Sequence, residues 1–132
     1  MNLESSNARL TAKGRQAPHT LGTAGEEAAV RYLKKKKYRV VVHNFRFHRG
    51  EIDLIAYDRK TLVFFEVKTR RSLSFGLPEE SVTPAKQRQI RKIAEAYLLT
   101  HNLRDVPCRF DILSVSFDER IGLDIRHFEN AF

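Results

Sequence analysis

Apolar residues along the chain follow two spacings, one helical and one typical of strands. Helical spacing predicts a helix over residues 23–37, with Thr23 as its N-cap and Glu26 three residues later, as in a capping box. Acidic residues near its start and lysines at its end suit the helix dipole. A second helix is predicted from Pro84, with Thr83 as its cap, because apolar residues then recur every three or four positions.

Runs rich in β-branched and aromatic residues predict the strands. Two of these runs flank a short polar turn and form a hairpin. A longer loop over residues 70–83, which contains Phe75, separates this hairpin from the second helix. The order α-β-β-β-α-β-β predicts an α/β fold with a mixed β-sheet flanked by helices. The predicted strands are residues 38–45, 51–57, 61–69, 108–117 and 121–128.

Length and composition narrow the class of protein. The 132 residues suit one domain, predicted over residues 21–132 after a flexible basic tail at 1–20. No apolar run reaches the roughly 20 residues of a membrane span, and no signal-peptide core is evident. The single cysteine, Cys108, agrees with a reducing compartment, so we expect a cytoplasmic protein without a membrane partner. The net charge of +8 favours a polyanionic partner, of which nucleic acid is the commonest.

Carboxylates stand at core positions of the predicted hairpin. If Arg59 and Lys60 form the tip of the turn, Asp53 lies opposite Glu66, and Glu51 lies opposite Lys68. Like charges directly opposite each other destabilise a sheet. The arrangement therefore needs a shared proton, a neighbouring cation or a bound divalent metal, and Mg²⁺ prefers such oxygen ligands.

The two helices bring further polar side chains to apolar faces. Glu26 lies on the apolar face of the first helix, and Lys86 or Gln87 extends the apolar stripe of the second. Together with Asp53, Glu66 and Lys68 of the hairpin, they form either a satisfied ion-pair cluster, an exposed face of the sheet, or a site for metal-assisted phosphodiester hydrolysis.

The ordered motifs carry a family resemblance. "GEIDLIA" followed by "FFEVKTR" resembles the PD-(D/E)XK nuclease motif, and with "GEEAAVRYL", "FG" and "SVTPAKQRQI" the chain resembles the bacterial YraN-like family, which is similar to archaeal Holliday-junction resolvases. The resemblance covers roughly residues 22–128. It implies a restriction-endonuclease-like core, metal-binding roles for Asp53 and Glu66, a catalytic Lys68 and an accessory, metal-supporting Glu26. Gln87 is a weaker correspondence.

The resulting prediction is a Mg²⁺- or Mn²⁺-dependent endonuclease acting on DNA. Branched or junction DNA as substrate and a homodimeric state follow from analogy with the resolvases alone. Nearby cations are candidates for contacts with the nucleic-acid backbone, namely Arg70, Arg71, Lys86 and Arg88. One alternative is a non-catalytic nucleic-acid-binding module that retains the nuclease fold. Another is a structural protein with a buried ion-pair network.

Overall fold

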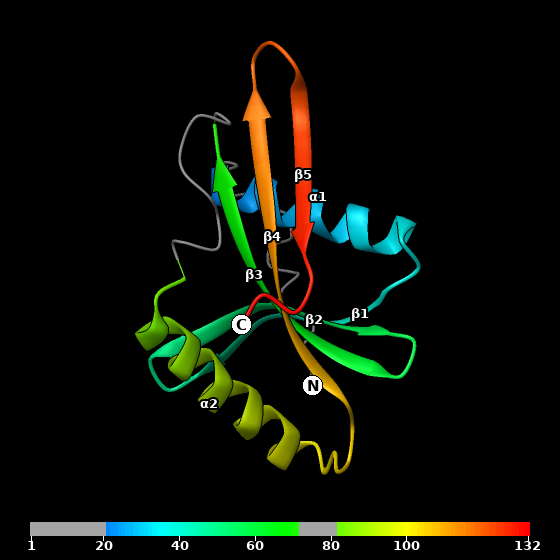
Figure 1. Ribbon diagram of the computed structural model, residues 1–132, viewed down its shortest axis with the longest axis vertical. Coiled ribbons are helices and arrows are strands. Elements are labelled where there is room, and N and C mark those ends of the chain that lie inside the picture. Colours follow the sequence, from blue (N-terminus) through cyan, green and yellow to red (C-terminus); the bar gives the residue numbers. More distant parts are fainter. Residues whose placement is uncertain (1–20, 72–81) are drawn as a thin grey trace, which may run out of the picture.

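The computed structural model describes residues 21–71 and 82–132. Its order of elements confirms the predicted α/β class and the order α-β-β-β-α-β-β (Figure 1). The predicted tail at 1–20 and most of the predicted 70–83 loop, including Phe75, lie outside the described residues. The elements are α1 (Leu21–Lys35), β1 (Arg39–Phe47), β2 (Gly50–Asp58), β3 (Thr61–Arg70), α2 (Pro84–Thr100), β4 (Cys108–Asp118) and β5 (Gly122–Phe128).

The five strands form one mixed sheet in the order β1-β2-β3-β4-β5. Strand β3 pairs with β4 in parallel, whereas the other three pairs are antiparallel. A parallel pair needs a long crossover connection. The segment containing α2 supplies it, since it lies between β3 and β4 in the chain (Figure 1).

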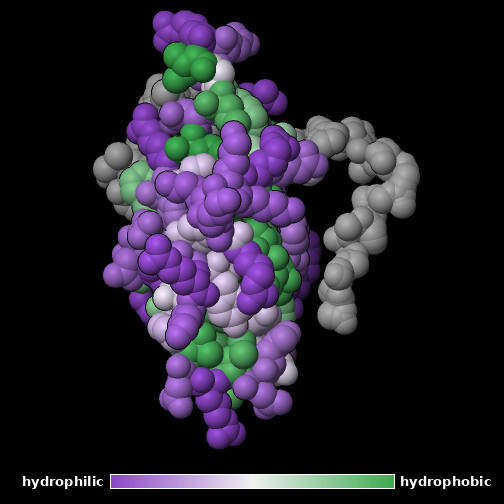
Figure 2. Space-filling view, turned by 90° about the vertical axis from the view of Figure 1, so that its right-hand side faces the viewer, coloured by the Kyte–Doolittle hydropathy of each residue, from purple (hydrophilic) through white to green (hydrophobic). Residues whose placement is uncertain are grey.

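The helices cover opposite faces of the sheet. Val63 and Phe65 of β3 pack in the apolar cluster that includes α1, whereas Leu62 and Phe64 pack in the cluster that includes α2. This alternation is what a strand buried on both faces requires. The face in Figure 2 is largely hydrophilic, with smaller hydrophobic patches near its upper end, beside its centre and near its lower end. No helix among the described residues is long and apolar enough to cross a membrane.

The predicted start of the first helix is wrong. Helix α1 begins at Leu21, so Thr23 lies inside its first turn, and that turn contains no acidic residue. The helix ends at Lys35, with lysines in its last turn as predicted. The cap of α2 is confirmed, because the Thr83 hydroxyl accepts a hydrogen bond from the Lys86 amide at 3.2 Å.

Gly25 sets how closely α1 approaches the sheet. It is buried, and a Cβ atom at this position would collide with the Thr69 side chain of β3. The neighbouring Ala28 and Ala29 are also buried, with 1% and 0% of their surfaces exposed. Small residues on this side of α1 therefore let the helix bring Glu26, which directly follows Gly25, close to β3.

We expect Gly25→Ala to lower the free energy of unfolding by about 1–3 kcal/mol, because overpacking forces the helix away from Thr69. Urea denaturation measures the change. The matched control is Gly22→Ala, at an exposed position of the same helix, where alanine should cost nothing. Equal stability of the two variants would show that α1 does not depend on this contact.

Candidate active site

The sheet forks at Asp53 and Glu66. Strands β2 and β3 pair in the predicted register from Asp58↔Thr61 to Leu54↔Phe65, which is the last pair of this ladder. Beyond it, β3 continues along β4 and β2 continues along β1. Asp53 and Glu66 therefore stand at the first position after the ladder ends, and not in a regular cross-strand pair as the hairpin predicted.

Asp53 bridges the opening of this fork. Its Oδ2 accepts a hydrogen bond from the Val67 amide at 2.8 Å, so the carboxylate takes the place of a backbone partner. The alternation of β2 also changes here, because Ile52 and Ile55 pack in the same cluster with α2 although they are three positions apart, an odd spacing that regular alternation would put on opposite faces. The bend at Asp53 thus orients its side chain toward the gap between the strands.

Glu51 does not lie opposite Lys68, as the predicted hairpin required. It pairs with Arg46 of β1 in the antiparallel ladder, and Arg46 Nη2 lies 3.4 Å from Glu51 Oε1. The reason is the fork, since β2 has left β3 before it reaches Glu51. The hairpin register was right, but it extends over fewer residues than predicted.

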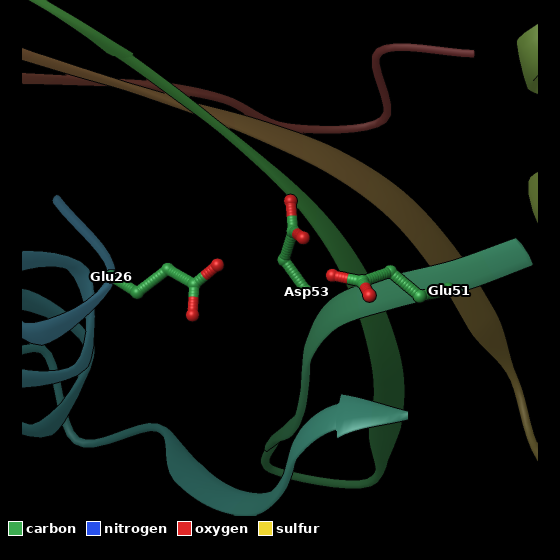
Figure 3. A group of neighbouring side chains, drawn as sticks. All are labelled: Glu26, Glu51 and Asp53. Atoms are coloured by element: carbon green, nitrogen blue, oxygen red, sulfur yellow. The ribbon is translucent and has the colours of Figure 1, made fainter. Parts of the chain in front are cut away.

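Three carboxylates converge at the fork. Glu26 points from α1 toward Asp53, and Glu51 points toward Asp53 from the other side (Figure 3). One oxygen of each lies within 4.8 Å of the others. Hard oxygen donors in such a group suit Mg²⁺ or Mn²⁺ better than soft metals. Glu26 and Asp53 belong to the predicted metal set and Glu51 joins them, whereas Glu66, the third member of that set, is not part of this group.

The carboxylates perturb one another. Burial and, after it, the negative charge of Glu66 raise the pKa of Asp53 to about 8, although the Val67 amide opposes the shift. Burial also raises the pKa of Glu26, and the charges of Glu51 and Glu66 add to this effect. Burial and acidic neighbours thus favour the protonated forms of Asp53 and Glu26, and a cation bound here would compensate their charge when they ionise.

Asn44 is a residue of this site that the sequence analysis missed. Its side chain hydrogen-bonds Glu26 and thereby opposes the rise in the pKa of that carboxyl. The flanking pairs His43↔Leu54 and Phe45↔Ile52 place Asn44 across from Asp53. Its φ of 51° is unusual in a strand, although asparagine tolerates it. An Asn soon after the β-branched run of residues 40–42 was the available signal.

Glu66 lies beside the acidic group and is paired with two lysines. Its Oε2 lies 3.4 Å from Lys68 Nζ and 3.8 Å from Lys86 Nζ, and the Glu66 side chain is only 8% exposed. The structure thus directs Lys86 toward the site. Gln87 instead donates a hydrogen bond from Nε2 to the Val82 carbonyl at 3.0 Å, so its amide contacts the segment before α2.

The predicted DNA-contacting arginines border this region. Arg70 ends β3 and lies two positions beyond Lys68, so the two side chains share a face of the strand. Arg71 directly follows β3, and Arg88 lies in the first half of α2; both are exposed. Arg88 lies about 200° around α2 from Lys86, which faces Glu66, so of these arginines Arg70 and Arg71 stand nearer to the site along the chain.

Asp111 is a buried carboxylate whose partners come from several parts of the chain. It is fully buried, and its carboxylate accepts hydrogen bonds from Arg109 and from the Asn130 amide, while His127 Nε2 lies 2.7 Å away. Burial alone would raise its pKa, but the partners His127, Arg109 and Asn130 lower it. This carboxylate is satisfied by the protein itself, in contrast to Asp53.

The raised pKa of Asp53 makes stability depend on pH. The folded protein holds this proton more strongly than the unfolded chain, whose value is near 3.8, so the contribution to stability is complete below about pH 4 and is lost as the pH rises to about 8. The slope is at most about 1.4 kcal/mol per pH unit. We expect Asp53→Asn to remove this slope and to be more stable than wild type at pH 8, as measured by urea denaturation without metal.

The control for this experiment is Asp124→Asn on β5, since Asp124 is paired with Arg126 at 3.1 Å near the surface. Its pH profile should follow that of wild type. A profile for Asp53→Asn that runs parallel to wild type between pH 4 and 8 would contradict the assignment.

Comparison with known proteins places this arrangement in a family. The family described as "Uncharacterised protein family UPF0102" matches residues 25–115, which include every acidic residue of the fork and both lysines. A UPF0102 protein of Chlorobium limicola is 51% identical over 120 residues, covering 87% of this chain and 93% of the relative. One from Geobacter sulfurreducens is 46% identical over 112 residues, covering 85% and 88%. The resemblance to the YraN-like family is confirmed, and the chain belongs to the UPF0102 family.

Proposed function

We infer that this protein is a divalent-metal-dependent endonuclease of the PD-(D/E)XK type that hydrolyses phosphodiester bonds in DNA. The observation that carries the proposal is the convergence of the Glu26, Glu51 and Asp53 carboxylates beside the Glu66–Lys68 pair. Acidic oxygens and an ammonium group within one site are what metal-assisted phosphodiester hydrolysis requires.

Each residue has a distinct part in this proposal. Glu26, Glu51 and Asp53 would hold Mg²⁺ or Mn²⁺, and Glu66 lies close enough to influence Asp53 electrostatically. The cation would supply Lewis acidity at the phosphate and lower the pKa of a bound water. Asp53 must release its proton for the cation to bind, while the Val67 amide keeps its carboxylate oriented.

The two lysines act on the negative charge of the phosphate. Lys68 and Lys86 hold their ammonium groups near the same oxygen of Glu66, so both are positioned before any substrate arrives. Lys68 would stabilise the charge that develops on the phosphate or orient the attacking water. Lys86, whose side chain is 40% exposed, would meet the nucleic-acid backbone together with Arg70, Arg71 and Arg88.

The proposal predicts cleavage that needs Mg²⁺ or Mn²⁺ and stops with EDTA. Labelled linear duplex, single-stranded, flapped and four-way DNA would be incubated with wild type and with Glu66→Gln. We expect the variant to lose roughly 100-fold or more of the activity, because it removes a charge that lies against both lysines.

The matched control is Glu119→Gln, an exposed residue in the β4–β5 turn, which should cleave as wild type does. Thermal melts establish that each variant is folded. Equal cleavage by Glu66→Gln would contradict the assignment of the site. DNA binding with no cleavage under either metal would favour the non-catalytic binding module instead.

A further inference from the structure

The β1–β2 hairpin presents an aromatic ring between arginines. We define the hairpin tip as residues 46–50, with the sequence RFHRG. A two-residue turn, His48 and Arg49, connects the strands, and Phe47↔Gly50 is the pair that closes it. Phe47 is 38% exposed, and the Arg46 side chain is 78% exposed. So tight a turn holds the ring in a defined place.

Packing in the hydrophobic core does not explain why an apolar residue stands at Phe47. Phe45, two positions earlier on the same face of β1, packs edge-on against Tyr97 of α2 with ring centroids 5.1 Å apart. The Phe47 ring instead meets the edge of the His48 ring, at 4.3 Å between centroids and an angle of 80°. A large apolar side chain thus remains accessible at the end of a strand whose other phenylalanine, Phe45, is partly buried against α2.

The hairpin tip reaches both faces of the sheet at the fork, with Arg46 on the side of the carboxylates and Phe47 on the side of α2, where Lys68 and Lys86 meet Glu66. Arg46 pairs with Glu51, one of the three converging carboxylates, at 3.4 Å. Gly50 packs so closely against Ile93 and Gln89 of α2 that a Cβ atom would collide with the Ile93 side chain. Gln89 is one helical turn from Lys86. In Figure 1 the β1–β2 turn accordingly lies beside the N-terminal half of α2.

Exposed aromatic rings flanked by cations match the chemistry of unpaired nucleotides. Each nucleobase has a face that stacks on an aromatic ring, and this stacking does not depend on sequence. Arg46 and Arg49 flank Phe47 in the chain; Arg49, in the exposed turn, would meet an adjoining phosphate, while Arg46 lies on the other face of the strand beside Glu51. In a continuous duplex the faces of the bases are covered by their neighbours, so the ring would have no partner there.

We propose that Phe47 stacks on an unpaired base adjoining the phosphate held at the carboxylate group. The inference rests on the proposed function and specifies its substrate class as DNA with unpaired bases, such as a gap or a single-stranded flap. It excludes a preference for fully paired DNA, whether linear or four-way. Phe47 is then a residue that selects the substrate, separate from the groups that perform hydrolysis.

The test measures binding in EDTA, so that it does not depend on cleavage. Fluorescence anisotropy would compare a gapped duplex with a continuous duplex of the same length. We expect wild type to prefer the gapped DNA, and Phe47→Ala to weaken that binding roughly 5- to 150-fold, the loss typical of one base–aromatic stack. Leu99→Ala, which removes another apolar residue that is 73% exposed, is the control and should bind as wild type does.

A second variant reports stacking directly. The chain contains no tryptophan, so Phe47→Trp introduces a single fluorophore at the tip. Its emission should change with gapped DNA and not with continuous duplex, while Leu99→Trp should respond to neither. Unchanged emission, or equal affinity of Phe47→Ala and wild type for gapped DNA, would overturn the inference even if the protein cleaves DNA. Stacking without metal-dependent cleavage would support it while the proposed function failed.

Discussion

The hydrogen bond from the Val67 amide to Asp53 is the constraint on which the site depends. Where β2 leaves β3, backbone groups lose their partners in the ladder, and a buried amide without a partner is costly. The Asp53 carboxylate supplies the missing acceptor. The fork therefore needs a polar side chain at this position, and that side chain then stands in the opening, where residues from α1 and β1 reach it.

The acidic group exists only in the folded chain, because its members come from different layers. Gly25 lets α1 approach β3, and Glu26 follows it directly in the chain. Glu51 arrives on β2 after the fork, with Arg46 beside it. On the other face, α2 begins at Pro84 under the Thr83 cap and directs Lys86 to Glu66. Carboxylates thus meet on the side of α1, and ammonium groups meet on the side of α2.

The sequence predicted the helices, the strands and the register of the β2–β3 hairpin better than the number of residues over which β2 and β3 pair. The β2–β3 register followed from the two-residue turn, because Asp58↔Thr61 fixes every later pair. The end of that ladder depends on where β2 turns away from β3 to stay paired with β1, which no local pattern encodes. Glu51 was therefore assigned the wrong neighbour. Asn44 was missed for the same reason, since its contact with Glu26 requires α1 to be docked.

Two buried carboxylates of this protein show how structural and functional charge differ. Asp111 is surrounded by donors, among them Arg109 and His127, and its pKa is lowered despite full burial. Asp53 has one backbone donor and three acidic neighbours, and its pKa is raised. The folded protein thus provides donors that stabilise the ionised form of Asp111. It provides fewer for Asp53, whose ionised form would be stabilised by a positive charge. A buried carboxylate without a positive partner is unfavourable. Such a carboxylate is therefore best explained where a bound ligand compensates its charge. The electrostatic imbalance at the fork, more than the presence of acidic residues, is therefore what supports a cation site there.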